Sequence, residues 1–389
     1  MQRTWGRLPW WAHALAIWAA SRVVSTALLA AFAAAQPASP YTGASPSLVD
    51  FSTMWDARWY EHVATHGYPD ELPRDATGAV DDNAWAFMPV FPMLVRALVR
   101  LGLDGEVAAL AIAWVASGAL AVLAMRLLRE TIPRHAAFAL ALALLGPLSP
   151  LLQVGYAESL HLALLVGALL ALRHGRWAML AALVPLVAFS RPSGLALALA
   201  LGIVWAARWW QRARTPWARR DRIALAALAA WALACGLAWP AYAAWRTGEP
   251  GAYVATELRW RAPYVGESGL VPGMGWVAGA QWWLGGAGLT LLVLVVGGLA
   301  WLLAQRATRV AMGLESWAWT IAYLLYLLAV WFPQSSTARI LMPAAGLVAV
   351  VAVLPGRWWR PLALVMGACG QVAWLWACWR VEGVDWTIP

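Results

Sequence analysis

Long apolar runs separated by short polar segments follow one another along the whole chain. A helix needs roughly 20 mainly apolar residues to cross a bilayer, and fewer where a neighbouring element completes the crossing. By this measure the pattern predicts an all-α polytopic membrane protein, a single transmembrane domain over residues 1–389 with about eleven spans. The expected spans are residues 11–33, 106–125, 136–152, 158–172, 177–190, 193–207, 223–246, 284–304, 312–332, 340–354 and 361–379.

The first apolar run has some features of a secretory signal peptide. Arg3 and Arg7 precede it, and the small residues of "AFAAAQ" follow it. Its apolar stretch is long for a signal, however, and Ser21 and Arg22 interrupt it. These features favour an uncleaved membrane anchor over a cleaved leader.

Arginines collect in alternate connections between the expected spans, which predicts an orientation. With a cytoplasmic amino terminus, every cytoplasmic connection is rich in arginine, as the positive-inside rule requires. These connections are residues 126–135, 173–176, 208–222, 305–309 and 355–361. We therefore expect a multi-pass protein of the plasma or inner membrane, with its amino terminus in the cytoplasm.

Two long connections fall on the extracytoplasmic side in this topology, residues 34–105 and 247–283. The part of the first connection before residue 86 has eight acidic residues and only two arginines, so its charge agrees with an outer location. Its last part, residues 85–106, is apolar but broken by prolines and arginines. A crossing there would move every later arginine cluster to the other side, so this part is interpreted as an amphipathic or re-entrant helix.

Composition excludes a soluble globular domain, because 62% of the residues are hydrophobic and only 12% are charged. The net charge of +9 comes from arginines in short connections, where topology explains it, so no nucleic-acid partner is expected. Many of the 30 tryptophans lie near the ends of apolar runs, as interfacial anchors do. The three cysteines lie in or beside apolar stretches and show no metal-ligand spacing.

The stretch "MWDARWYEHVATHGYP", residues 54–69, places charged groups among aromatic ones directly after the first span. A carboxylate such as Asp56 in a water-restricted cleft can act as a general base or orient a sugar hydroxyl. Alternatively, Asp56 pairs with Arg58 or caps a helix. Asp50 is a second base, a metal ligand or a solvated group.

Asp50, Arg58 and three aromatic residues of the first outer connection are candidates for substrate binding. Trp55, Trp59 and Tyr60 stack on sugar rings or anchor the connection to the headgroup layer. His62 and His66 have a spacing that can bind metal on a helix, but no third ligand is in register. No cofactor is therefore expected, and a divalent metal stays an open alternative.

Three more polar residues are expected on the outer face, each beside an apolar run. Arg191 stands between Ser190 and Pro192, which break the run around it. Arg191 and Arg339 can each bind a phosphate through a planar guanidinium, or extend to lipid headgroups. Glu158 positions a hydroxyl or binds Arg191.

Four segments resemble motifs of one known family, the PIG-V-like mannosyltransferases, and they follow the family's order. "WDARWYEHVATHGYP" with "AFMPVFPMLVRAL" is similar to its "WD-x-x-WY" and "FFPLYPLL" signature. "YAESLHLAL", "SRPSGL" and "SSTARILMPAAGL" resemble its later segments, so that the resemblance covers residues 10–350. The chain departs from the pattern at Met88, Val90 and Ile340, which weakens inferences about donor and acceptor.

The resemblance implies a bundle of the GT-C type and a mannosyltransferase that uses a polyprenyl-phosphate sugar. It implies transfer to a hydroxyl of an exported glycan, glycolipid or protein on the extracytoplasmic face, with Asp56 as the base. A β-linked donor would then give an α-linked product. No glycine-rich nucleotide loop is recognisable, in agreement with a lipid-linked donor.

Two other functions remain open from the sequence. A lipid or sugar-lipid transporter would need similar outer arginines together with a continuous polar path. Few ionisable residues lie within the spans, which argues against such a path. A non-catalytic assembly subunit of the same fold is the other alternative.

Overall fold

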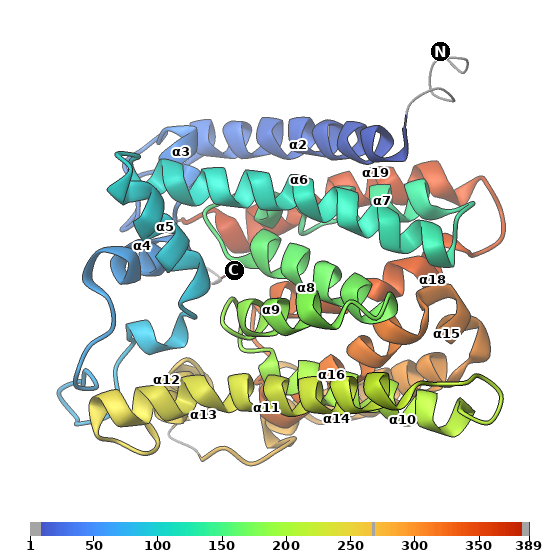
Figure 1. Ribbon diagram of the computed structural model, residues 1–389. Helices are drawn as coiled ribbons and strands as arrows, with labels where there is room; N and C mark the ends of the chain where they lie inside the picture. The colour runs from blue at the N-terminus through green and yellow to red at the C-terminus, as the bar shows by residue number, and fades with distance from the viewer. Residues whose placement is uncertain (1–8, 267–268, 383–388) are drawn as a thin grey trace. The chain divides into compact units, whose positions relative to one another are not determined.

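The computed structural model describes residues 9–266, 269–382 and 389. All its regular elements are helices (Figure 1), and Arg74 and Val80 form an isolated β-bridge. The prediction of an all-α protein is thus confirmed. The helices of the amino-terminal half are α2 (Trp10–Ala35), α3 (Leu48–Ser52), α4 (Asp56–His66), η1 (Ala84–Ala86), α5 (Val90–Arg100), α6 (Gly105–Thr131), α7 (Ala136–Leu145), η2 (Ser149–Leu152), α8 (Glu158–Arg173) and α9 (Trp177–Ala188).

The remaining helices follow in the carboxy-terminal half. They are α10 (Gly194–Gln211), α11 (Arg219–Thr247), α12 (Ala252–Arg259), α13 (Ala262–Val265), α14 (Met274–Ala304), α15 (Arg306–Met312), α16 (Leu314–Val330), α17 (Thr337–Ile340), η3 (Met342–Leu347), α18 (Val348–Ala352), α19 (Trp359–Trp374) and η4 (Leu375–Trp379).

Five helical segments among the described residues are long and apolar enough to cross a membrane: α2, α6, α11, α14 and residues 359–379. A sixth is obtained if α15 and α16, which meet at a bend of 109°, form one broken span. Shorter apolar helices, including α7 and α9, occupy other expected spans. The helices thus indicate a multi-pass membrane protein, and the figure of about eleven spans stays a prediction that relies on shorter segments completing a crossing.

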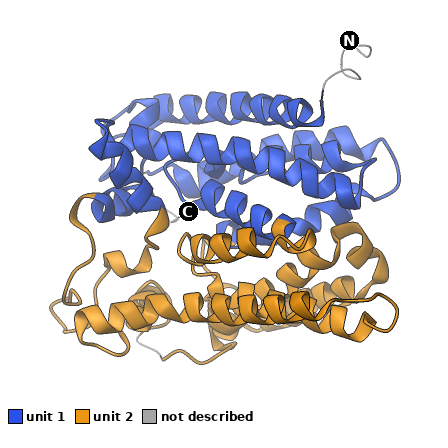
Figure 2. Cartoon of the chain, viewed as in Figure 1, with its two compact units in different colours: residues 1–64, 91–170, 338–389 blue, residues 65–90, 171–337 orange. Residues whose placement is uncertain are grey.

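The chain divides into two compact units, each built from separate stretches of sequence (Figure 2). Unit 1 comprises residues 1–64, 91–170 and 338–389, and unit 2 comprises residues 65–90 and 171–337. Both ends of the sequence therefore contribute to unit 1. The first outer connection also contributes to both units, because its part after residue 64 belongs to unit 2 until residue 90.

In unit 1, α2 packs along α6 and α7 (Figure 1). The Trp18 ring lies edge-on to Trp114, with ring centroids 6.0 Å apart, and its indole N–H donates to the Ser117 hydroxyl at 2.9 Å. Alanines and leucines of the three helices fill the space between them. The small alanine side chains let the helices approach closely, as in membrane bundles.

In unit 2, α10 packs between α11 and α16, and it meets α11 at a pair of glycines. A Cβ atom on Gly194 would lie 2.6 Å from the Gly236 Cα, too close for any real contact. The first turn of α10 can therefore approach α11 only because both positions have no side chain. This contact also fixes the position of the connection that carries Arg191.

We expect Gly194→Ala to lower the free energy of unfolding by about 1–3 kcal/mol, because the added methyl group forces the two helices apart. Denaturant unfolding of the purified full-length protein in detergent measures this change.

The matched control is Gly202→Ala on the same helix, where a Cβ atom would have nothing within 4 Å. That change should be neutral or stabilising, since alanine favours helix over glycine by up to about 1 kcal/mol. Equal effects of the two changes would contradict the close contact.

Candidate functional site

A strained turn between α3 and α4 places Asp56 at the start of α4. Trp55, the residue before it, has φ 60°, in the left-handed region that bulky side chains rarely adopt. Its buried indole donates to the Trp379 carbonyl at 3.1 Å, and its ring packs 4.7 Å from that of Tyr41. Such strain persists only where the surroundings hold it, and it gathers at functional sites.

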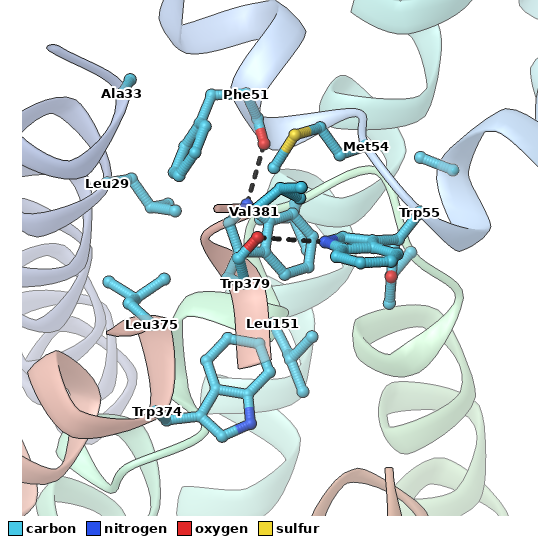
Figure 3. Close-up of a cluster of buried hydrophobic side chains, with 13 residues drawn as sticks. Leu29, Ala33, Phe51, Met54, Trp55, Leu151, Trp374, Leu375, Trp379 and Val381 are labelled. Carbon is cyan, nitrogen blue, oxygen red and sulfur yellow. Dashed lines mark hydrogen bonds between the residues drawn. The ribbon is translucent and has the colours of Figure 1, made fainter. Parts of the chain in front are cut away.

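The apolar core around this turn combines residues of α2 and α3 with residues of α19 and η4 (Figure 3). The Trp379 indole donates to the Phe51 carbonyl at 2.9 Å, so that this tryptophan and Trp55 bracket the turn with two hydrogen bonds. Leu29 and Leu375 are fully buried beside them. The structure thus places Trp55 inside an apolar core, where it supports the backbone at Asp56.

Asp56 forms an ion pair with Arg339, and Glu158 lies on the other side of the same guanidinium. Arg339 Nη1 is 2.5 Å from Asp56 Oδ2, and Arg339 Nε is 3.6 Å from Glu158 Oε1. The three side chains are 16%, 8% and 4% exposed for Asp56, Arg339 and Glu158. Three sequence candidates from distant segments thus meet in unit 1, with two carboxylates around one cation.

Tyr156 is a further member of this site. The Asp56 backbone N–H donates to the Tyr156 hydroxyl at 3.2 Å. The Arg339 guanidinium lies over the Tyr156 ring, 5.2 Å from its centroid, which is a cation–π geometry. Tyr156 was not among the candidates predicted from the sequence, although it stands two residues before Glu158 in the segment "YAESLHLAL".

The protonation states of the site follow from burial and from the ion pair. Burial raises the pKa of the Tyr156 hydroxyl well above its ordinary value, and the Asp56 carboxylate raises it further. Burial lowers the pKa of the Arg339 guanidinium, but Asp56, Tyr156 and Tyr60 together more than offset this effect and leave that pKa raised. At neutral pH, Tyr156 is therefore a neutral hydroxyl and Arg339 a permanent cation.

The segment between α7 and α8, which carries Tyr156, is a helix break, and a buried arginine of α2 holds it. Arg22 is 2% exposed, and it donates to the Ser149 carbonyl at 3.0 Å, the Ser149 hydroxyl at 2.6 Å and the Gln153 side-chain oxygen at 3.1 Å. Backbone groups freed by a helix break at membrane depth need such partners. Arg22 is the hydrogen-bond donor to Ser149 and Gln153 in the segment between α7 and α8.

The helix break also contacts the strained turn directly. The Gly155 N–H donates to the Ser52 carbonyl at 3.0 Å. A Cβ atom on Gly155 would lie 3.2 Å from the Ala57 side chain, which is tighter than ordinary packing. The close approach sets the spacing between Asp56 on one segment and Tyr156 on the other.

The other candidates of the first outer connection have local roles in the structure. Asp50 and Ser47 form a capping box at the start of α3, with hydrogen bonds of 3.1 and 3.3 Å. Arg58 donates to the Tyr41 carbonyl and stacks on its ring. The salt-bridge partner of Asp56 is therefore Arg339 and not Arg58, the alternative that the sequence left open.

Two aromatic candidates lie on α4 itself. Tyr60 is buried, and its ring centroid is 4.9 Å from that of Phe91 on α5. Trp59 is partly exposed and lies edge-on to His62, with ring centroids 6.0 Å apart. Within the described residues, no group of three or more His, Cys, Asp or Glu side chains is arranged to hold a metal ion. His62 and His66 therefore belong to no such group.

Arg191 belongs to unit 2, in the connection between α9 and α10. Electrostatic coupling links it to Tyr253 and Glu257 of α12 and to Tyr323 of α16. The structure thus groups Arg339 with Asp56 and Glu158 in unit 1, and Arg191 with a separate set of polar residues in unit 2.

The chain matches no protein-family model and no curated protein. The resemblance to the PIG-V-like mannosyltransferases therefore depends on the four motif segments and their order.

We expect Arg22→Met to lower the free energy of unfolding by about 1–3 kcal/mol for each buried acceptor that loses its donor, chiefly the Ser149 carbonyl and the Gln153 amide oxygen. Arg126→Met on α6 is the control. The Arg126 side chain is 43% exposed, and its ion pair is an i,i+4 contact of 3.6 Å with Glu130. Its effect should stay within about 0.5 kcal/mol. A similarly small effect at Arg22, measured by denaturant unfolding, would contradict its role in holding the break.

Proposed function

We propose that this chain is a membrane glycosyltransferase that moves a mannosyl residue from a polyprenyl-phosphate donor to a hydroxyl of an exported glycan, glycolipid or protein. The observation that supports the proposal is the Asp56–Arg339–Glu158 cluster. Its members come from three of the segments that resemble the PIG-V-like family. Each of these segments matches the family only weakly by itself, yet together they contribute three residues to one buried site.

The chemistry needs a base that is ionised and held in place. In the proposed reaction the acceptor hydroxyl oxygen bonds to the anomeric carbon while the bond from that carbon to the phosphate oxygen breaks. The electron pair of the broken bond stays on the phosphate, and the hydroxyl proton passes to an Asp56 carboxylate oxygen. Water-restricted surroundings suit Asp56 to this role, and the contact with Arg339 holds the carboxylate in position.

Arg339 serves the two carboxylates in this arrangement. Its Nη1 donates a hydrogen bond to Asp56 Oδ2, and its Nε lies 3.6 Å from Glu158 Oε1, beyond hydrogen-bond distance. We therefore assign Arg339 to orienting Asp56 and to stabilising charge near the reacting centre. Arg191 and Arg339 both stay candidates for the donor phosphate, as the sequence predicts.

A lipid-linked donor suits a chain of long apolar helices, because the prenyl tail stays in the bilayer while the headgroup enters the site. The distribution of arginines supports an extracytoplasmic site, in a protein of the plasma or inner membrane. Such a location also suits an acceptor that has been exported.

We expect Asp56→Asn to reduce mannosyl transfer by about 10²–10⁴-fold, the range for loss of a general base. The assay uses purified full-length protein in lipid nanodiscs, radiolabelled polyprenyl-phosphate mannose, and a glycan and lipid extract of the cells that express the protein. Glu61→Gln is the matched control, since it makes the same acid-to-amide change at an exposed position of the same helix. It should transfer at the wild-type rate.

Transfer by the Asp56→Asn variant at the wild-type rate would contradict the proposed base. Wild-type protein that binds the donor and forms no labelled product would contradict the enzyme as a whole, and would leave a transporter or an assembly subunit as the better description.

A further inference from the structure

The connection between α10 and α11 concentrates positive charge on one surface of unit 2. Residues 208–222 include six arginines and a single acidic residue, Asp221. Four of these arginines are exposed, namely Arg212, Arg214, Arg219 and Arg220. The chemistry proposed for Asp56 uses none of them, so these four exposed arginines are available to another partner.

A group of tryptophans fixes the shape of this surface. The rings of Trp205 and Trp209 are nearly parallel, with centroids 5.2 Å apart, and the ring of Trp217 lies edge-on to that of Trp205 at 6.2 Å. The Trp205 indole also donates to the Arg222 carbonyl at 3.1 Å. These contacts tie the end of α10 to the start of α11, so the connection is held against both helices.

Trp209 also orders two guanidinium groups. The Arg212 guanidinium lies 3.8 Å from the centroid of the Trp209 ring, and its Nη1 donates to the Trp209 carbonyl at 2.7 Å. The Arg222 guanidinium lies 5.6 Å from the centroid of the same ring. Both distances are within the range of cation–π contacts. An arginine held in this way loses less conformational freedom when it binds an anion.

The carboxylates beside this surface are engaged in other contacts. Asp221 accepts a hydrogen bond from the Trp177 indole at 2.9 Å, and it lies 3.7 Å from Arg220, whose side chain is 89% exposed. Glu315 of α16 is buried and lies 3.0 Å from Arg208. Arg208 is therefore neutralised in a buried ion pair, whereas the four exposed arginines leave the surface with a net positive charge.

The location of the surface favours lipid over an aqueous partner. The connection leads into α11, which begins at Arg219 and is long and apolar enough to cross a membrane. Trp210, beside the arginines, is 80% exposed. Tryptophan is enriched where a span meets the headgroup layer. An exposed indole next to arginines at the start of a span thus suits a bilayer surface better than a soluble polyanion.

We propose that residues 208–222 bind the headgroups of anionic phospholipids, with the exposed guanidinium groups on the phosphates and Trp210 beside them in the headgroup layer. Clusters of roughly four to eight basic residues on the cytoplasmic side of a span favour anionic lipids in this way. The predicted topology has this connection on the cytoplasmic side. The inference does not depend on the proposed function, because it involves no residue of the Asp56 site.

The test titrates the full-length protein in a neutral detergent with phosphatidylglycerol, or with phosphatidylcholine of the same acyl chains. Native mass spectrometry gives the dissociation constant of each bound lipid. The first phosphatidylglycerol should bind at least about tenfold more tightly than the first phosphatidylcholine, since each arginine near an anionic lipid contributes about fivefold. Added salt should reduce this preference, because exposed charges are screened. Glycerol phosphate, the soluble headgroup, should not compete.

Matched variants separate charge from folding. The fourfold glutamine variant carries Arg212→Gln, Arg214→Gln, Arg219→Gln and Arg220→Gln. It should lose the preference for phosphatidylglycerol while it keeps the thermal transition of the wild type. Lysine at the same four positions should retain most of the preference, because the charge remains. The single change Arg219→Gln should weaken binding of phosphatidylglycerol by about fivefold, and it gives the same test if the fourfold variant is unstable.

Arg100→Gln is the control outside this surface. It removes an exposed arginine from the last turn of α5, in unit 1. The total charge of the chain therefore changes as in Arg219→Gln, but the affinity for phosphatidylglycerol should stay that of the wild type.

Equal affinity of the wild type for the two lipids would overturn the inference, and so would a folded fourfold glutamine variant that keeps the preference for phosphatidylglycerol. Glycerol phosphate that displaces the lipid would indicate a site for aqueous anions, which also contradicts the proposal. Mannosyl transfer is tested separately by Asp56→Asn, so none of these results decides the proposed function.

Discussion

The candidate site depends on one guanidinium held between two carboxylates away from water. Such a cluster is costly to desolvate, and its attraction compensates only when the geometry is close. Removing one partner of a buried ion pair typically destabilises a protein by about 3–5 kcal/mol, because the other charge is left unpaired. Arg339 therefore constrains the two segments that carry Asp56 and Glu158, which lie about a hundred residues apart in the sequence.

The surrounding structure supplies the support that such an ion cluster requires. On one side, Trp55 accepts an unfavourable backbone conformation because two tryptophan hydrogen bonds and an apolar core hold it. On the other side, Arg22 satisfies the polar groups of a helix break. The turn and the helix break both depart from regular helix. Asp56 directly follows Trp55 in the turn, and Tyr156, whose ring contacts Arg339, lies in the break. Departures of this kind are expected at functional sites.

Apolar periodicity predicted the helical class, because burial of backbone polar groups in a bilayer leaves few other solutions. It also indicated which polar residues were out of place in an apolar chain, and Asp56, Glu158 and Arg339 were among them. It could not decide whether Asp56 pairs with Arg58 or with Arg339. That choice depends on how distant segments pack, whereas the sequence pattern describes only one segment at a time.

Other residues were missed for related reasons. Arg22 was treated as an interruption of the first span, since a single sequence cannot show that the break after α7 provides its hydrogen-bond acceptors. Tyr156 looked ordinary in sequence, because its properties arise from burial and from neighbours on other elements. Helices as short as α7 and α9 do not cross a bilayer by themselves, so apolar run length alone does not give the number of spans.

A double-mutant cycle between Asp56 and Arg339 tests the central contact most directly, without any assumption about the substrate. The free energy of unfolding is measured in detergent for the wild type, Asp56→Asn, Arg339→Gln and the double variant. A close, shielded ion pair predicts that the second change costs less when the first is present, with a coupling energy of at least about 1 kcal/mol. Effects that add to within about 0.3–0.5 kcal/mol would contradict the ion pair on which the account depends.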